Sequence, residues 1–270
     1  MNGGTFFTGK WTNPNWLIAE TQKYYDEIPA EKQVGDRFSL AQSRIVDRRE
    51  WGPAQRLIAP NLDKVIRELG IYYVPKTMAP GPCIVFPIRD YHQEKIITAH
   101  KINPFYELIG RGGPAKYPFL GEKPTEGKPS WLGDTDETLA AIAKYRAALL
   151  VEGPYDLVAV RLLHPGAPVL SSGTKRVNLA QVRYLAMLNV RNVYVMFDHE
   201  PGKNGREGAG DAAARYTVKE WNGKYKMQWQ AVATLAEDPS DSLKDHGTAL
   251  RFSQQLRMLF PVPRERKVSK

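Results

Sequence analysis

Short apolar runs alternate with helix-like segments over the second half of the chain. The apolar runs have the length of buried strands, and the segments between them have the composition of helices. Asp134 and Glu137 have the spacing of a helix-capping pair, and Asn178 and Gln181 repeat it. We therefore expect strands at 148–153, 167–172, 193–200 and 227–235, and helices at 138–147, 155–163, 178–189 and 208–221. Such alternation predicts an open, mainly parallel sheet with helices on both faces.

The first half of the chain has a different pattern. Residues 51–70, WGPAQRLIAPNLDKVIRELG, are typical of two short helical pieces, the second ending at Gly70. Two β-rich runs within 82–102 flank the polar turn DYHQE and predict an antiparallel hairpin. The segment 110–133 is rich in Gly, Pro and Lys and is expected to be a basic loop region. The fold class is therefore an α+β N-terminal subdomain followed by an α/β domain with a mainly parallel sheet.

These patterns divide the chain into four parts. The first fifty residues contain several aromatic side chains between polar breaks, and no fold is assigned to them. The C-terminal part ends in the basic sequence RERKVSK, which is typical of a solvated tail. The expected parts are an unassigned N-terminal segment at 1–50, an N-terminal catalytic subdomain at 51–133, the α/β domain at 134–245, and a C-terminal helix with a basic tail at 246–270.

Composition restricts the class of protein. Hydrophobic residues make up 42% of the chain and charged residues 25%, which is ordinary for a soluble globular protein. No apolar stretch approaches the length of a membrane span, and the opening residues, MNGGTFFTGKWTNPNW, lack the pattern of a secretory signal. We expect a cytoplasmic protein, in the host cytoplasm if it is viral, with no membrane partner.

The charge balance points to a partner. The formal net charge is +9, and the Lys and Arg residues are spread along the chain. A cation placed against a phosphate releases counterions, so this balance favours a polyanion, although charge alone is equally consistent with a role in solubility. The single cysteine, Cys83, excludes an internal disulfide and a Cys-rich zinc site. No zinc is expected in this chain.

Acidic residues gather where the predicted strands end. Glu152 follows the first of these strands, and Asp198 and Glu200 follow the third. Asp156 opens the next helix, and Asp238 lies beyond the last strand. Ligands bind beyond the carboxyl ends of parallel strands, so these side chains are expected to meet at one rim. Such a cluster is costly without cations, and Mg²⁺ suits carboxylates and substrate phosphates.

Each of these acids also has a plain structural explanation. A single Glu after a strand commonly begins a polar loop, and Asp156 could simply favour the helix N-terminus through the helix dipole. The coincidence of acids at several strand ends is more specific than any one of them. The residues alone leave open whether one carboxylate acts as a general base while the others bind metal.

Several motifs resemble one known family. The stretch VEGPYD (151–156) resembles the E-G-x-x-D signature of topoisomerase-primase (TOPRIM) domains, and VMFDHEPGKNGREGAGDAAARY (195–216) resembles their D-x-D motif and the following small-residue helix. Other segments resemble bacterial and phage-type replicative primases in the same order: FPIRD (86–90), GRGGPAKYPFL (110–120), SGTKRVNLAQVRYL (172–185) and EDPSDSL (237–243). The resemblance covers roughly residues 55–245. It implies a primase-type N-terminal catalytic subdomain followed by a TOPRIM domain.

The resemblance implies a role for each acid. Glu152 becomes the catalytic carboxylate, acting as a general base for the attacking 3′-hydroxyl and also lying among the metal ligands. Asp198 and Glu200 become catalytic residues that bind Mg²⁺ or Mn²⁺, with Asp156 and Asp238 as supporting ligands. Nucleotidyl transfer needs metal ions at the phosphate oxygens and cations around the incoming triphosphate, which agrees with this assignment.

The basic loop gains a role through the same resemblance. Arg111, Lys116 and Tyr117 become candidates for contact with nucleotide phosphates or the template backbone. Without the motif, a solvated loop is the simpler interpretation. The implied partners are a single-stranded DNA template and nucleoside triphosphates, together with a replicative helicase or a separate zinc-bearing subunit.

The chain departs from the family pattern at four points. Glu200 replaces the usual second aspartate and lengthens that ligand by a methylene, and Ser240 stands where another acid is expected. The segment 199–210, HEPGKNGREGAG, inserts a Gly-rich loop after the acidic pair. No zinc-binding domain is recognised before the core and no helicase-docking domain after it.

Three functions remain open at this point. The first is a phage-type primase that makes short RNA primers on single-stranded DNA. The second is a TOPRIM nuclease, which would leave the loop at 110–120 without a role. The third is an inactive single-strand binding module with aromatic side chains such as Trp11 and Trp16 stacking on bases. A binder of phosphates gains nothing from a concentrated acidic site. A topoisomerase would need further domains that the chain has no room for.

Overall fold

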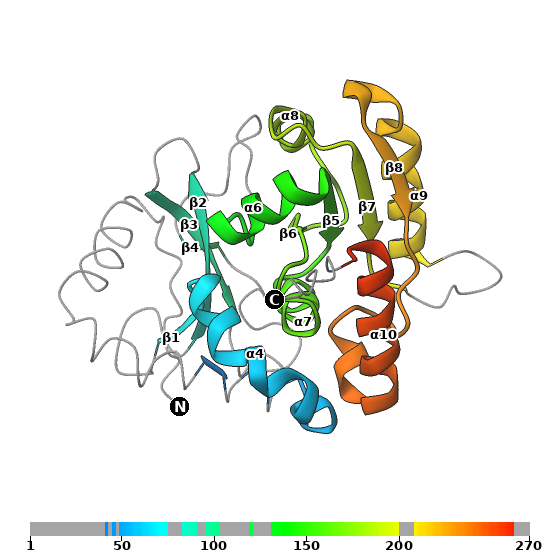
Figure 1. The fold of residues 1–270 in the computed structure, drawn as a ribbon. Helices are drawn as coiled ribbons and strands as arrows, with labels where there is room; N and C mark the ends of the chain where they lie inside the picture. Colours follow the sequence, from blue (N-terminus) through cyan, green and yellow to red (C-terminus); the bar gives the residue numbers. More distant parts are fainter. Residues whose placement is uncertain are drawn as a thin grey trace, which may run out of the picture.

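The computed structural model describes residues 41–42, 45–46, 49–74, 83–90, 95–102, 119–120, 131–199 and 208–261. Within these ranges the chain forms two separate four-stranded sheets (Figure 1). The first sheet is antiparallel, with strands in sequence order: β1 (Tyr72–Val74), β2 (Cys83–Asp90), β3 (Lys95–Ile102) and β4 (Phe119–Leu120). The second is wholly parallel, with the order β6-β5-β7-β8: β5 (Ala147–Val151), β6 (Val169–Ser171), β7 (Asn192–Met196) and β8 (Gln228–Ala231).

Helices precede, connect and follow these strands. They are η1 (Gly52–Ala54), α4 (Gln55–Glu68), α6 (Asp136–Tyr145), α7 (Pro154–Leu163), α8 (Leu179–Met187), α9 (Ala209–Trp221), η2 (Lys224–Lys226), η3 (Asp241–Lys244) and α10 (His246–Leu259). The predicted order of an α+β part followed by an α/β part with a parallel sheet is confirmed, as is the antiparallel hairpin of β2 and β3. None of the helices in the described ranges is both long and apolar enough to cross a membrane.

The helix starts show why these segments fold as helices. At the start of α8, the Asn178 backbone N–H donates to Gln181 Oε1 at 3.0 Å, and the Gln181 N–H donates to Asn178 Oδ1 at 2.9 Å, which confirms the predicted capping pair. At the start of α6 the prediction is wrong by one residue. Thr135 is the N-cap there and accepts from the Thr138 N–H, whereas Asp134 accepts a hydrogen bond from the Tyr184 hydroxyl at 2.8 Å.

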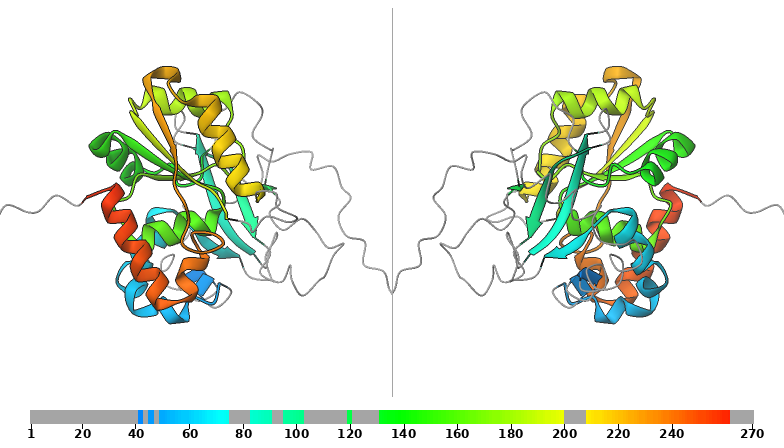
Figure 2. Two further views of the ribbon diagram at one scale, coloured as in Figure 1. Left: turned by 90° about the vertical axis from the view of Figure 1, so that its right-hand side faces the viewer. Right: turned by 90° about the vertical axis from the view of Figure 1, so that its left-hand side faces the viewer.

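The parallel sheet separates two apolar cores. Along β5, Ala147, Leu149 and Val151 belong to a core built with α4, α7 and α10, while the alternate residues Ala148 and Leu150 belong to a core that includes α8 and α9. Figure 2 shows α9 and α10 on opposite sides of the sheet. A strand that is apolar on both faces reads as an unbroken apolar run, which explains the pattern seen in the sequence.

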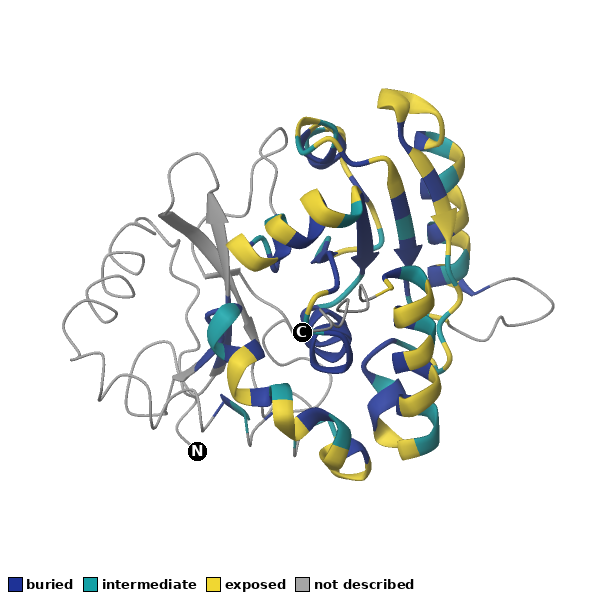
Figure 3. Ribbon diagram, viewed as in Figure 1, coloured by how far each residue is buried: buried dark blue, intermediate teal, exposed yellow. Residues whose placement is uncertain are grey.

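Helix α7 is the most enclosed of the described helices. All ten of its residues are buried, and it lies among the parallel sheet, α4 and α10 (Figure 3). It begins directly after Gly153, two residues beyond β5. The start of α7 is therefore held firmly at the carboxyl end of β5, where the first predicted site residue lies.

A buried ion pair joins the two parts of the chain. The Arg161 side chain on α7 is fully buried, and its Nη2 lies 2.5 Å from Glu68 Oε2 at the end of α4. Arg161 Nη1 also donates to Thr138 Oγ1 at 3.1 Å. Two turns earlier in α4, Asn61 Nδ2 donates to the carbonyl of Leu162, the residue after Arg161, at 2.8 Å. These contacts hold α4 against α7.

Replacing Glu68 with Gln is expected to lower the free energy of unfolding by about 1–3 kcal/mol, because the buried Arg161 guanidinium loses its charged partner. The matched control is Asp63→Asn, which removes the exposed pair between Asp63 and Arg67 and is expected to cost less than about 1 kcal/mol. Urea unfolding followed by circular dichroism measures both. If both variants lowered the free energy of unfolding equally, the buried pair would contribute no more to stability than the exposed pair.

Candidate active site

The predicted acids that the structure describes lie at the carboxyl ends of the parallel strands. Glu152 follows β5 directly, Asp198 lies two residues beyond β7, and Asp238 lies in the loop after β8. Because β5, β7 and β8 are neighbouring parallel strands, their carboxyl ends lie on one edge of the sheet. Asp156, in the first turn of α7, lies at the same edge.

Asp156 is the buried centre of this edge. Its Oδ2 accepts from the Gly153 N–H at 2.8 Å, and its Oδ1 accepts from the Ser240 N–H at 3.2 Å, so it joins the start of α7 to the loop after β8. Burial raises the pKa of the Asp156 carboxyl well above its ordinary value, and the negative charges of Asp238 and then Asp198 raise it further. Holding Asp156 ionised therefore requires nearby positive charge.

The loop after β8 is folded around Asp238. Asp238 Oδ1 accepts from the Ser240 hydroxyl and from the Asp241 N–H, each at 2.6 Å. The Ser240 carbonyl in turn accepts from the Trp51 indole N–H at 2.8 Å. Ser240 is thus a structural residue of the loop, buried and bonded on several sides.

Asp241 supplies an acid one residue beyond the position where the sequence comparison expected it. Its Oδ1 lies 2.9 Å from Arg49 Nη2 and 2.9 Å from Lys244 Nζ. The signal was visible in the sequence EDPSDSL, in which an acid follows Ser240 directly. A one-residue shift in this loop is enough to move the carboxylate from position 240 to position 241.

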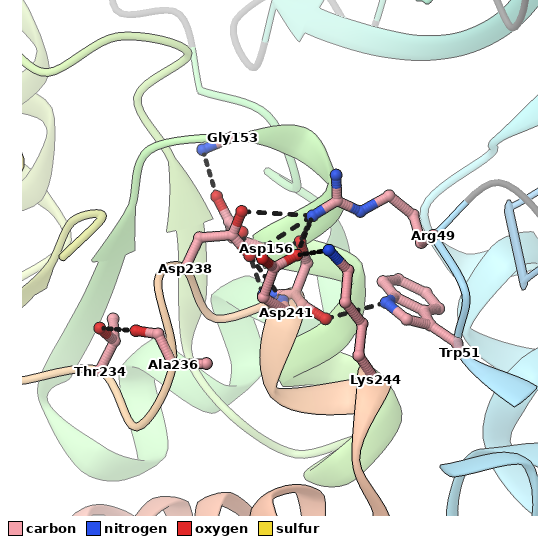
Figure 4. Close-up of polar contacts among 10 residues, drawn as sticks. Arg49, Trp51, Gly153, Asp156, Thr234, Ala236, Asp238, Asp241 and Lys244 are labelled. Carbon is pink, nitrogen blue, oxygen red and sulfur yellow. Dashed lines mark hydrogen bonds and ion pairs between the residues drawn. The ribbon is translucent and has the colours of Figure 1, made fainter. Parts of the chain in front are cut away.

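Arg49 is a second residue of this site that sequence reasoning missed. It belongs to the part of the chain to which no fold was assigned, yet its Nη2 lies 3.2 Å from Asp238 Oδ2 and 2.9 Å from Asp241 Oδ1 (Figure 4). The same nitrogen donates to the Ser240 hydroxyl. The Arg49 guanidinium also lies over the Tyr155 ring, 5.1 Å from its centroid. Its positive charge lowers the pKa of Asp156, against the effect of burial.

The loop after β7 is tied to its neighbours through its backbone. The His199 N–H donates to the Glu237 carbonyl at 2.5 Å, which joins this loop to the one after β8. His199 Nδ1 lies 2.7 Å from Asp211 Oδ2 in the first turn of α9. Gly210 of α9 approaches the Asp198 carbonyl so closely that a Cβ atom built on it would lie 1.9 Å from the Asp198 oxygen. Asp198 is therefore positioned by close backbone packing.

Four predicted site residues, Glu200, Arg111, Lys116 and Tyr117, lie outside the described residues. Within the described ranges, no group of three or more His, Cys, Asp or Glu side chains is arranged as a metal site. The donors still fit a hard cation in their chemistry, because they are carboxylates and because the negative charges of Asp238 and Asp198 raise the pKa of Asp156.

The fold is shared with known structures. No protein-family model and no curated protein matches the chain. The RNA polymerase domain of Mycobacterium tuberculosis primase DnaG is similar over 92% of this chain and 83% of its own, with 18% identity and a TM-score of 0.56. The zinc-binding and RNA polymerase domains of Aquifex aeolicus primase are similar over 91% of this chain and 66% of theirs, with 18% identity and a TM-score of 0.56. A DnaG catalytic domain bound to single-stranded DNA is similar over 90% of this chain and 78% of its own, with 16% identity and a TM-score of 0.55.

These structural neighbours are catalytic cores of DnaG primases, and they span most of the chain. The protein therefore has the fold of the primase catalytic core, comprising both the antiparallel part and the parallel α/β part. At this level of identity, the likeness is one of fold, and the function must be argued from the residues at the carboxyl edge of the sheet.

Proposed function

We propose that the protein is a primase-type nucleotidyltransferase with a TOPRIM domain, which synthesises short RNA primers on single-stranded DNA. The observation that carries the proposal is the gathering of Glu152, Asp156, Asp198 and Asp238 at the carboxyl edge of the parallel sheet, within a fold shared with primase cores. Binding of a polyanion alone would be weakened by such a concentration of negative charge.

The proposed chemistry assigns a step to each group. Glu152 accepts the proton of the attacking 3′-hydroxyl, whose oxygen forms the new bond to the α-phosphorus while pyrophosphate leaves. Asp198, with Glu200, would hold Mg²⁺ or Mn²⁺, which when bound neutralises charge on the phosphate oxygens. Asp156 holds the start of α7 against the loop after β8, so that the carboxylates keep their positions.

The same carboxylates would serve a TOPRIM nuclease, in which water replaces the 3′-hydroxyl as nucleophile. The antiparallel sheet of β1 to β4 favours the polymerase, because a nuclease needs no nucleotide pocket beside its metal site. A nucleoside triphosphate and a template strand are the substrates that the proposal requires. A helicase or a zinc-bearing subunit is proposed as a further partner, since template selection needs more than backbone contacts. Primer synthesis from ribonucleotides on single-stranded DNA is the direct test.

Lys116→Ala and Arg111→Ala are expected to raise the KM for nucleotides or weaken template binding without unfolding the protein. If the contact is to a phosphate, each variant should lose about one unit from the slope of log binding constant against log salt. Fluorescence anisotropy of a labelled single strand over a salt series measures this slope. The matched control is Lys226→Ala, at the exposed end of η2, two residues before β8. Wild-type KM and slope in both variants would assign the two residues to a solvated loop.

A further inference from the structure

Arg49 places a fixed positive charge within the acidic edge, where a metal ion would otherwise be expected. Its guanidinium contacts both Asp238 and Asp241, at 3.2 and 2.9 Å, and it comes from a segment almost 190 residues away in the sequence. A guanidinium presents a planar set of donors and keeps its charge at any ordinary pH. It therefore supplies permanently what a bound cation would supply at this position.

The Arg49 side chain is held in place, unlike that of an ordinary surface arginine. Only 18% of it is exposed, and its guanidinium lies over the ring of Tyr155. Tyr155 is itself buried and makes edge-on contacts with Trp51 and Phe86, at centroid distances of 6.4 and 5.7 Å. The pair between Arg67 and Asp63 is a useful contrast, because it is exposed and lies on a single helix. Arg49 is therefore built into the packing between the two parts of the chain.

The oxygens of Asp238 are already engaged. Oδ1 accepts from the Ser240 hydroxyl and the Asp241 N–H, and Oδ2 faces Arg49. Asp241 is shared between Arg49 and Lys244. A divalent ion at this side of the edge would have to displace a guanidinium from two carboxylates at once, and the two cations would repel each other. Glu152 and Asp198, which follow the neighbouring strands β5 and β7, form the other side of the edge.

We infer that Arg49 serves as a built-in cation on the Asp238–Asp241 side, so that divalent metal binds only on the side formed by Glu152 and Asp198. This inference deepens the proposed function and rests on it. Arg49 acts here as a positioning residue, because it holds the carboxylates and sets how many metal ions the edge accepts. It also makes the segment before α4 a part of the active site.

Arg49→Gln is expected to bind one more Mn²⁺ per chain than the wild type, because Asp238 and Asp241 become available as ligands for a second ion. Arg49→Lys keeps the charge and should keep the wild-type number. Arg67→Gln, which removes an exposed arginine, is the matched control and should also keep it. Titration of the full chain with Mn²⁺, followed by electron paramagnetic resonance of the free ion, counts the bound ions without template or nucleotide.

The inference would be overturned if folded Arg49→Gln bound the same number of Mn²⁺ ions as the wild type. Tighter Mn²⁺ binding at an unchanged number of ions would also overturn it, because loss of a nearby positive charge is enough to raise the affinity. Asp241→Asn provides a second test in case Arg49→Gln does not fold. The Mn²⁺ affinity of Asp241→Asn should stay within about threefold of that of the wild type, because this variant loses a charge near the metal but no metal ligand. A loss of about tenfold or more would identify Asp241 as a ligand and contradict the inference. Because binding is measured without synthesis, failure here is distinguishable from failure of the proposed primase activity.

Discussion

Glu152→Gln is expected to reduce the rate of primer synthesis by about two orders of magnitude or more, the scale on which loss of a positioned general base acts. Glu152 follows β5 directly and lies partly buried at the carboxyl edge. An amide of the same shape neither accepts the proton of the 3′-hydroxyl nor carries charge toward a metal ion. The fold should be unaffected, since the substitution conserves volume and lies outside the apolar cores. Primer yield on a single-stranded template measures the effect.

The control for this variant is Glu237→Gln, the same substitution at an exposed residue next to Asp238. It removes a negative charge near the edge without touching β5, and its rate is expected to fall by no more than about fivefold, as for a surface charge. Thermal melting of both variants should match the wild type. Primer synthesis by Glu152→Gln at the wild-type rate would remove Glu152 from the mechanism.

Gly210→Ala should have the second large effect, through the position of Asp198. A Cβ atom on Gly210 would lie 1.9 Å from the Asp198 carbonyl oxygen and 2.8 Å from its carbonyl carbon. These are backbone atoms, so either α9 or the loop after β7 must move. The expected costs are about 1–3 kcal/mol of unfolding free energy from overpacking and about a hundredfold in synthesis, because a displacement of about 1 Å is enough to disturb catalytic geometry.

Gly52→Ala is the matched control, because a Cβ atom on Gly52 meets nothing within 4 Å. It should retain both stability and activity. The two readouts for Gly210→Ala are chemical unfolding and the Mg²⁺ dependence of primer synthesis. Wild-type stability together with an unchanged Mg²⁺ requirement would show that the close contact between α9 and Asp198 does not position the carboxylate.

The parallel sheet could be predicted because its signals are local. Strands β5 and β6 are buried along their whole length and so appear as short apolar runs, and the Asn178–Gln181 capping pair acts over three residues. The helix start near Asp134 shows the limit of such signals. Asp134 and Thr135 are both good N-cap residues, and the choice was made by the distant Tyr184, whose hydroxyl bonds to Asp134.

The acidic edge could be predicted only in part. Glu152, Asp156, Asp198 and Asp238 were located from strand ends and motifs, and the structure places each of them at the carboxyl edge. Arg49 could not be found in this way, because its partners lie 189 and 192 residues further along the chain. A contact between residues so far apart leaves no periodic pattern in the sequence. The assigned roles of these acids stay predictions.

The most direct test of the primase proposal is incubation of the full chain with a single-stranded DNA template, labelled ribonucleotides and Mg²⁺, with Glu152→Gln in parallel. The proposal predicts short labelled RNA from the wild type, its loss when the metal is chelated, and strongly reduced product from the variant. Shortening of the template without RNA synthesis would instead indicate a nuclease. Template binding with neither reaction, at any Mg²⁺ or Mn²⁺ concentration, would contradict the proposal and leave the protein as a single-strand binding module.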